Sequence, residues 1–338
     1  MNNQIFNDKI IDAIREKLPS DISLTTILSE TLFLGKEALY RRLRGTVPFT
    51  FAEIVSLCEK FDLSLDYIFK KEQQTKAVFD LCFLDPYDSD EVYFDMLTNY
   101  VRKVRKLRSY PNSYSLMALN ILPYMFYQPL ESISKFNIFK WRYIMNKGID
   151  KITFSDFSIT DKVRNIQKEA TRETLSILKN QILLSPRTFE SFLNDINYFR
   201  QIYLISDDDY LSLKEELNAV LDDLEYMTIH GKYRAGNEVM IYLSNIDFLA
   251  SYVYFGSDGF EFTHFRICAA NCIDSEDPVV CTLKKDWINS LMKASTLISL
   301  SGGIERIAFF EKQRKLINDP IDDIQKNDIV ISDTLNII

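Results

Sequence analysis

The segment TTILSETLFLGKEALYRRLRG occupies residues 25–45 and holds two runs of helical periodicity separated by a turn. Apolar residues recur at helical spacing over 25–32 and again over 36–43, which predicts two short helices. Leu39 and Leu43 are four residues apart, so they lie together on the inward face of the second helix. The charged side chains between and beside them are therefore expected to point largely outward.

Further helices flank this pair on both sides. Apolar residues within 6–18 recur at helical spacing and predict a first helix. Thr50 and Glu53 are spaced as a capping box, in which the hydroxyl accepts from the glutamate amide and the carboxylate reaches back, so another helix begins there. A last helix of one or two turns is expected to begin at Ser64. Residues 1–70 are thus predicted to form a bundle of five short helices.

This arrangement resembles the helix-turn-helix domain of lambda-repressor-like, Cro/C1-type (XRE) bacterial transcription regulators. The resemblance extends to FTFAEIVSLCEKFDLSLDYIF at 49–69, because such regulators commonly have a helix here and a Leu-Ser-Leu-Asp-Tyr ending like that of 63–67. Gly45, which stops the preceding helix, fits the same pattern. The resemblance covers about the first 70 residues and none of the remainder. It implies a DNA-binding domain whose recognition helix, 36–43, enters the major groove.

Seven residues are candidates for contacting double-stranded DNA under this resemblance. Residues near the N-terminus of a recognition helix reach the base edges, and the candidates here are Lys36, Glu37, Tyr40 and Arg41. Arg42 and Arg44 are expected to contact phosphates, which position a domain without reading sequence. Thr25 matches the start of the first motif helix, where an amide and a hydroxyl meet a phosphate. One motif per chain implies a homodimer with half-sites about one helical turn apart.

Two positions differ from the family pattern. Phe33 stands where the turn often has glycine, and Gly35 stands at the usual Ser or Thr cap. Because a bulky residue is strained at positive φ, we expect a turn of different geometry.

The charge of the predicted recognition helix differs from that of the whole N-terminal region. Residues 36–44 carry four basic side chains and one acidic one, Glu37, whereas residues 1–72 carry ten basic and eleven acidic ones. At physiological salt, exposed charges more than about 8 Å apart are largely screened from each other. The local basic patch is therefore expected to determine the contact with phosphates.

The rest of the chain predicts a larger domain of different character. The polar stretch 71–76 lacks an apolar face and is interpreted as a linker that follows the domain at 1–70. An α+β domain is expected at 77–320, and a tail follows it at 321–338. The parts expected in the larger domain are a mostly helical region at 77–232, a small antiparallel β-meander at 238–283 and two helices at 285–317. The expected fold class is therefore mostly α with a small β part. A domain of this size suggests dimerisation, the sensing of an unknown small-molecule or protein effector, or both.

Composition narrows the class of protein. The chain has 338 residues, is 46% hydrophobic and contains 24 Phe and 18 Tyr, so we expect it to fold. A net charge of −8 excludes a globally basic nucleic-acid coat protein. Five cysteines without a signal sequence indicate a reduced, cytoplasmic protein. No run of about 18 apolar residues occurs, so we expect no membrane span.

The sequence argues against an enzyme. Its nine glycines form no P-loop or dinucleotide-binding pattern, and His230 and His264 leave little scope for histidine-based catalysis. We assign no catalytic residue and expect no cofactor. His264, Cys268, Cys272 and Cys281 lack the paired spacing of zinc sites, so we expect no metal and interpret the cysteines as small apolar side chains.

Two charged runs each admit two interpretations. The basic run at 102–108 is consistent with DNA contact beside the main site, but we favour a solvated helix end, where cations oppose the negative end of the helix dipole. The run Asp207–Asp209 suggests a metal, but with Ser206 before it a helix cap is the better explanation.

The sequence therefore predicts a cytoplasmic, sequence-specific transcription regulator that acts without enzymatic chemistry. The main alternative is a protein–protein interaction module whose helical N-terminal domain does not bind DNA, its arginines forming a solvated face. An enzyme with a regulatory N-terminal domain is the third hypothesis. Salt-sensitive binding to DNA distinguishes the first from the second, because it reports contacts with phosphates.

Overall fold

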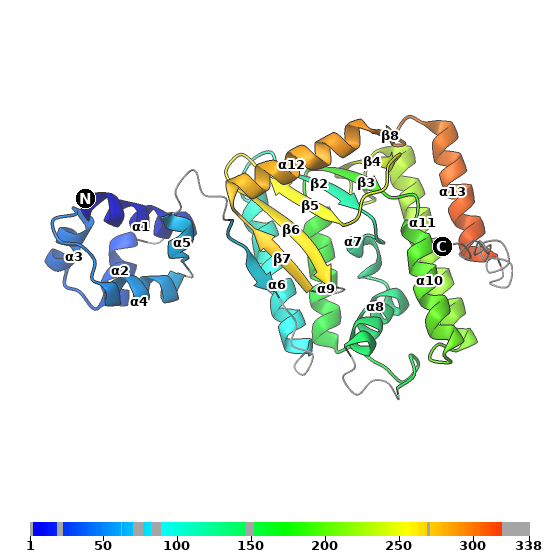
Figure 1. The fold of residues 1–338 in the computed structure, drawn as a ribbon, viewed down its shortest axis with the longest axis horizontal. Coiled ribbons are helices and arrows are strands. Elements are labelled where there is room, and N and C mark those ends of the chain that lie inside the picture. Colours follow the sequence, from blue (N-terminus) through cyan, green and yellow to red (C-terminus); the bar gives the residue numbers. More distant parts are fainter. Residues whose placement is uncertain are drawn as a thin grey trace, which may run out of the picture. The chain divides into compact units, whose positions relative to one another are not determined.

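The computed structural model describes residues 3–18, 23–61, 63–69, 77–82, 89–145, 152–268 and 271–319, and the structural statements below concern these residues. The chain divides into two compact units, unit 1 (Met1–Val78) and unit 2 (Phe79–Ile338), which are described separately (Figure 1). The predicted linker at 71–76 and the tail at 321–338 lie outside the described residues. In the described ranges, no helix is long and apolar enough to cross a bilayer.

Unit 1 is a bundle of short helices packed around one apolar core. They are α1 (Asn3–Lys17), α2 (Leu24–Leu32), α3 (Lys36–Leu43), α4 (Phe51–Phe61) and α5 (Leu65–Ile68). These bounds confirm the helices expected from periodicity. Ile14, Leu28, Leu39 and Leu57 form the centre of the core and are almost fully buried. Burying such side chains stabilises the bundle by roughly 1.5–3 kcal/mol each.

A buried polar residue of α1 fixes the loop between α3 and α4. The side-chain amide of Asn7 donates to the carbonyl oxygens of Arg42 and Val47, at 2.8 and 3.2 Å, and its Oδ1 accepts from the amide of Phe49 at 3.4 Å. A buried amide needs such partners because leaving it unpaired costs about 1–3 kcal/mol. Asn7 therefore ties the end of α3 to α1.

The expected capping box at the start of α4 is confirmed. The amide of Glu53 donates to Thr50 Oγ1 at 3.3 Å, and the amide of Thr50 donates to Glu53 Oε2 at 2.7 Å. The two contacts satisfy donors that the first turn of a helix cannot pair internally.

The expectation of an unusual turn between α2 and α3 was wrong. Phe33 adopts the left-handed conformation, with φ 52° and ψ 37°, which glycine supplies in many such turns. Its side chain is 94% exposed and so meets no steric obstacle beyond its own backbone. The left-handed conformation costs roughly 1–2 kcal/mol, which packing of α2 and α3 outweighs. The turn is fixed further by Ser29 Oγ, which donates to the carbonyl oxygen of Leu34 at 2.5 Å.

Unit 2 is built on one mixed sheet. Its strands are β1 (Asp80–Cys82), β2 (Tyr114–Leu119), β3 (Lys179–Leu184), β4 (Glu238–Ser244), β5 (Tyr252–Gly256), β6 (Glu261–Cys268), β7 (Asn271–Ser275) and β8 (Ser295–Leu297). Their order across the sheet is β1-β7-β6-β5-β2-β3-β4-β8. Strands β2, β3 and β4 run parallel, and every other neighbouring pair is antiparallel. The sheet and its helices confirm the α+β class.

Helices cover the two faces of this sheet unequally (Figure 1). They are α6 (Ser89–Arg108), α7 (Tyr124–Tyr127), α8 (Glu131–Ile144), α9 (Asp161–Leu175), α10 (Thr188–Gln201), α11 (Asp207–His230), α12 (Pro278–Lys293) and α13 (Gly303–Asn318). Helix α12 packs on one face, where Ile288 and Leu291 meet Leu116 and Leu183 of the sheet. The opposite face carries the main core.

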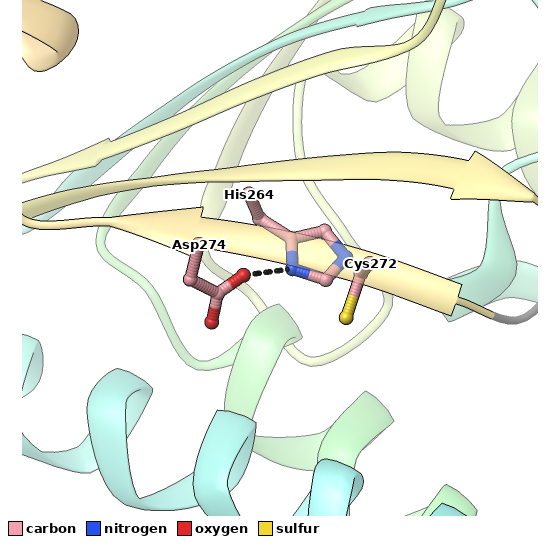
Figure 2. A group of neighbouring side chains, drawn as sticks. All are labelled: His264, Cys272 and Asp274. Atoms are coloured by element: carbon pink, nitrogen blue, oxygen red, sulfur yellow. Dashed lines mark hydrogen bonds and ion pairs between the residues drawn. The ribbon is translucent and has the colours of Figure 1, made fainter. Parts of the chain in front are cut away.

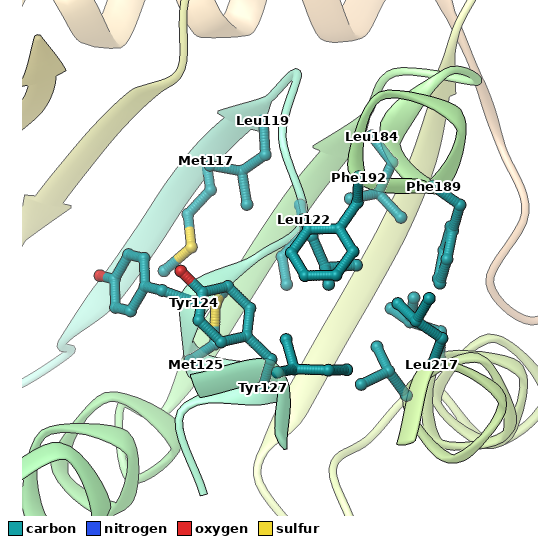
Figure 3. Close-up of a cluster of buried hydrophobic side chains, with 14 of the residues drawn as sticks. Met117, Leu119, Leu122, Tyr124, Met125, Tyr127, Leu184, Phe189, Phe192 and Leu217 are labelled. Carbon is teal, nitrogen blue, oxygen red and sulfur yellow. The ribbon is translucent and has the colours of Figure 1, made fainter. Parts of the chain in front are cut away.

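The main core joins the sheet to the remaining helices. Figure 3 shows Leu119 of β2 and Leu184 of β3 facing Phe192 of α10, Leu217 of α11 and Tyr127 of α7. The parallel strands are linked by helices on this face, as parallel connections require. The core therefore holds the carboxyl ends of β2 and β3 against α7 and α10.

Three expectations for unit 2 need correction. The region 77–232, expected to be mostly helical, also contains β1, β2 and β3. The region 238–283 is not a self-contained antiparallel meander, because β4 pairs with β3 and β8 and lies far across the sheet from β5. The helix expected from residue 285 begins at Pro278, where Asp277 caps it, and the last residues expected in it form β8 instead.

Candidate functional site

The exposed face of α3 is the first candidate site. Lys36, Glu37, Tyr40, Arg41 and Arg44 are all exposed, as their positions relative to the inward-facing leucines predict. The guanidinium carbon of Arg44 lies 6.0 Å from the centre of the Tyr40 ring. In the described residues, neither the side chain of Lys36 nor those of Arg41 and Arg44 form an ion pair with a carboxylate. Three cations and one anion therefore face solvent on this helix.

Arg42 does not belong to that exposed face, which corrects its expected role as a phosphate contact. Its Nη2 lies 2.7 Å from Glu53 Oε1 and its Nε donates to Glu53 Oε2 at 2.9 Å, and the side chain is only 15% exposed. Position 42 follows Leu39 by three residues, so helical periodicity turns it toward α4. The guanidinium is thus held within the bundle.

Burial alone would raise the pKa of Glu53, but hydrogen bonds from Arg42 and Thr50 together with the charge of Arg42 outweigh it, so that the pKa lies below its usual value. The carboxylate therefore stays charged at neutral pH and keeps Arg42 in place.

Thr25 lies in the first turn of α2 and is half-buried. Its Oγ1 is 3.0 Å from Oγ of Ser23, the residue that precedes the helix. Ser23 makes no side-chain cap bond to the helix amides. The amides at this helix start therefore remain unpaired by a capping side chain, as an anion-binding helix N-terminus requires.

Unit 2 contains the second candidate site, a cavity of about 310 Å³. Residues that follow the carboxyl ends of the three parallel strands line it: Asn120 after β2, Thr188 after β3 and Ser251 after β4. In sheets with parallel strands, this edge is where ligands bind most often. The volume lies near the lower end of the range for small-molecule sites. Sequence reasoning missed this site because it requires the sheet order.

Strands β6 and β7 supply a polar wall of the cavity. His264 and Arg266 alternate along β6, Cys272 and Asp274 alternate along β7, and all four line the cavity. His264 pairs with Asp274 across the two strands, and Arg266 pairs with Cys272. Because paired and alternate residues share one face of a sheet, the four side chains form a block. The strand register shifts directly after Arg266, as bulges beside functional sites often do.

Asp274 is the centre of a buried charge network, and Figure 2 shows its contact with His264. Its Oδ1 lies 2.7 Å from His264 Nδ1, and its Oδ2 lies 3.0 Å from Lys103 Nζ, which also contacts Asp80 at 2.9 Å. Burial alone would raise the pKa of Asp274, but the charges and hydrogen bonds of His264 and Lys103 lower it overall. Both oxygens of this carboxylate are therefore occupied.

The same cluster is the described group whose donor atoms best suit a metal ion. One donor atom from each of His264, Cys272 and Asp274 lies within 4.8 Å of the other two, and this donor set is one that zinc accepts. A metal would have to displace either the His264 hydrogen bond or Lys103 from Asp274. The structure thus brings together His264 and Cys272, two of the residues considered as zinc ligands from the sequence. The third member of the cluster, Asp274, was not a candidate in the sequence. The side chain of Cys268 lies outside the described residues, and Cys281 belongs to α12, on the side that packs against the sheet.

Arg266 is the cation of the cavity wall that lacks an acidic partner. Its Nη1 donates to the Tyr127 hydroxyl at 3.5 Å, and its guanidinium carbon is 5.6 Å from the centre of the Tyr124 ring. No ion pair joins it to a carboxylate in the part of the chain that the structure describes. The other cation that lines the cavity, Lys140, is paired with Asp195 at 2.6 Å.

Tyrosine hydroxyls around Arg266 are neutral donors and acceptors. The Tyr100 hydroxyl is 2.8 Å from the hydroxyls of Tyr124 and Thr174, and Tyr93 accepts from Gln167 at 3.1 Å. Burial raises the pKa of Tyr93 to about 12, so this hydroxyl carries no charge at neutral pH. The tyrosines therefore cannot neutralise Arg266.

The basic run at 102–108 is mostly bound within unit 2, in contrast to the solvated end expected. Lys103 is buried against Asp274, and Arg105 and Arg108 both form ion pairs with Glu173 of α9. The ammonium of Lys106 lies 3.9 Å from the centre of the Phe260 ring. The run Asp207–Asp209, by comparison, caps α11 as expected, since Ser206 and Asp209 form a capping box.

Comparison of the chain with protein-family models, curated proteins and solved structures gives no match. The function of the protein is therefore inferred from the geometry of these two sites.

Proposed function

We propose that the protein is a cytoplasmic transcription regulator that binds double-stranded DNA through α3 of unit 1. The observation that carries this proposal is the set of basic side chains on α3, Lys36, Arg41 and Arg44, which are exposed and form no ion pair in the described residues. A surface cation without an acidic partner is available to a phosphate or to a guanine edge. The helix is also short and amphipathic, which suits insertion into a major groove.

Each candidate has a distinct part in this proposal. Lys36, Glu37, Tyr40 and Arg41 read base edges, and Arg41 in two-point contact with a guanine contributes roughly 1–3 kcal/mol of discrimination. Arg44 contacts a phosphate, and the open amides near Thr25 donate to another. Arg42 is left out of the DNA contacts because Glu53 holds it. A homodimer places two copies of α3 on successive half-sites.

The test is DNA binding by the full-length protein. Sequences are selected from random duplex DNA, and affinity for the selected site is measured by fluorescence anisotropy at several salt concentrations. We expect R41A to lose specific affinity by about 10-fold or more, in line with one lost guanine contact. R15A is the matched control, because Arg15 is exposed on α1 and pairs with Asp12. Equal affinities of R41A and wild type would remove Arg41 from the readout.

Exposed aromatic residues favour a second candidate function for unit 1, binding to another protein. Phe33 and Phe51 are large apolar side chains that are mostly exposed, and aromatic residues are enriched at protein interfaces. The selection experiment distinguishes the two candidates. Failure to enrich any duplex, together with no salt-sensitive binding to mixed DNA, would favour the protein partner.

A further inference from the structure

We propose that the cavity of unit 2 binds a small organic anion, whose carboxylate or phosphate group pairs with Arg266. Such a ligand would bind unit 2 alone, whether or not unit 1 binds DNA. Arg266 in the cavity wall is a permanent cation. The ligand is identified by the chemistry that complements this guanidinium.

Charges taken out of water are normally paired, because an uncompensated one is costly. The rest of the cavity follows this rule: Lys140 pairs with Asp195, and Asp274 pairs with Lys103 and His264. Arg266 departs from it, with a tyrosine hydroxyl at 3.5 Å and the face of a ring as its contacts. Both contacts are too weak to replace a carboxylate. An anionic ligand would complete the pairing.

Geometry also points to an anion at this place. A guanidinium presents its donors in a planar fork that matches the two oxygens of a carboxylate or phosphate. Arg266 stands beside Cys272 and next to His264 on the same face of the sheet, with the strand register shifted immediately after it. A register irregularity of this kind bends its strand locally, and it often occurs beside functional sites.

The remaining wall defines the body of the ligand. Apolar and aromatic side chains make up much of it, among them Leu97, Leu122, Tyr124, Ile138 and Phe192. Asn120 and Gln128 add amide groups at the side. Such a lining, apolar with a few polar groups, is typical of sites for small organic molecules. The ligand class is therefore an organic acid with an apolar or aromatic body, small enough for about 310 Å³.

The experiment uses the full-length protein and three probes of similar shape: phenylacetate, phenyl phosphate and the neutral phenylacetamide. Thermal unfolding is followed by tryptophan fluorescence, since Trp141 and Trp287 both lie in unit 2, and calorimetry gives the stoichiometry. We expect at least one anion to bind at one site per chain and to raise the melting temperature by about 2–4 °C at saturating concentration. Phenylacetamide should leave the melting temperature unchanged. Which anion gives the larger shift distinguishes a carboxylate ligand from a phosphate ligand.

Two variants complete the test. R266M removes the charge and keeps a long apolar side chain, so it should abolish the anion-dependent shift and also melt higher than wild type without ligand, because a partly buried, unpaired charge has been removed. K162M is the matched control, since Lys162 lies outside the cavity lining and forms an exposed pair with Glu91. It should keep the anion-dependent shift. Three results would each overturn the proposal. The first is an anion-dependent shift that persists in R266M, and the second is the absence of a shift with either anion in wild type. The third is a lower melting temperature of R266M than of wild type without ligand.

Discussion

Arg42 of α3 and Glu53 of α4 form a two-point ion pair, with contacts of 2.7 and 2.9 Å, and both side chains are about 15% exposed. The same carboxylate accepts the amide of Thr50 at 2.7 Å. Glu53 therefore caps one helix and holds the neighbouring helix in place. The orientation of the proposed recognition helix depends on this single side chain as well as on the apolar core.

Replacing Glu53 by Gln should destabilise unit 1 by about 1–3 kcal/mol, because the guanidinium of Arg42 loses a charged partner in a partly buried place. Hydrogen exchange of the α3 and α4 amides in the full chain measures the effect. E59Q is the control, since Glu59 is exposed on the same helix.

The stabilisation by Glu53 should also depend on pH. Because the pKa of Glu53 is lowered on folding, the stabilisation is present above the usual glutamate pKa of 4.5 and is lost as the pH falls through the lowered pKa. E53Q should lack that acid-dependent loss, and equal acid sensitivity of the two proteins would contradict this assignment.

Phe33 and Gly45 both have positive φ, 52° and 69°, yet substitution should have opposite effects at the two positions. F33G removes the strain of a side chain in the left-handed region without loss of packing, so we expect a gain of about 0.5–1 kcal/mol. G45A introduces the same strain and a Cβ at 2.7 Å from Cβ of Gln4, so it should destabilise unit 1. Hydrogen exchange of unit 1 checks both. A loss of stability in F33G would show that its ring makes contacts that offset the strain.

Replacing Lys103 by Met should destabilise unit 2 by about 3–5 kcal/mol, because it leaves the buried carboxylate of Asp274 without its ammonium partner. The double variant K103M/D274N should lose less than the sum of the single variants. Urea unfolding followed by tryptophan fluorescence provides the values. K162M is the control, since Lys162 and Glu91 form an exposed pair, and its effect should stay below about 1 kcal/mol.

The same pair sets the pH range over which unit 2 is most stable. The pKa of Asp274 is lowered, so its contribution is present above its usual value of 3.8 and lost as the pH falls through the lowered pKa. The pKa of Lys103 is raised: burial alone would lower it, but the nearby carboxylates of Asp274 and Asp80 outweigh that effect. Its contribution is therefore present below 10.5 and lost as the pH rises through the raised pKa. The pair should therefore stabilise unit 2 throughout the range from about pH 4 to pH 10, and the loss of this stabilisation in wild type within that range would contradict the assignment.

Arg105 and Arg108 should not contribute to the salt dependence of DNA binding, because both are paired with Glu173. The double variant R105A/R108A should keep the wild-type slope of log Kd against log salt, whereas R44A should reduce it, because Arg44 is assigned a phosphate contact. A smaller slope for R105A/R108A would mean that these guanidiniums leave Glu173 to reach DNA.

Much of unit 1 could be predicted from the sequence because its signals are local. Each helix has an apolar face with helical spacing, and the Thr50–Glu53 cap marks one start. Two details depended on tertiary structure instead. Phe33 accepts a strained conformation because packing of the helices imposes it, and Arg42 turns inward because Glu53 is near in space but distant in sequence.

The sheet of unit 2 was largely missed for a physical reason. The residues of β2, YSLMAL, are nearly all buried, because helices cover both faces of this strand. A strand buried on both faces shows a continuous apolar run, without the alternation that marks a half-exposed strand, and such a run is also compatible with a helix. β4 was recognised as a strand, but its neighbours β3 and β8 are not adjacent in sequence.

The cavity could have been approached through alternation on β6 and β7. His264 with Arg266 and Cys272 with Asp274 are spaced by two residues around a short connection, which places them on one face of a hairpin. Zinc spacing among histidines and cysteines alone does not reveal this pattern, because Asp274 supplies the third donor atom. No local signal shows that Arg266 lacks a partner, since that depends on which carboxylates the fold brings near.

The pairing of β1 with β7 has a consequence for synthesis of the chain. Asp80 lies opposite Asp274, about two hundred residues later, so the edge of the sheet closes only after most of unit 2 has left the ribosome. At about 5–20 residues per second this takes roughly ten to forty seconds. The helices of unit 1 rely on contacts close in sequence and fold much faster. Nascent chains should therefore display a finished α3 while the partner strand for β1 has still to be made.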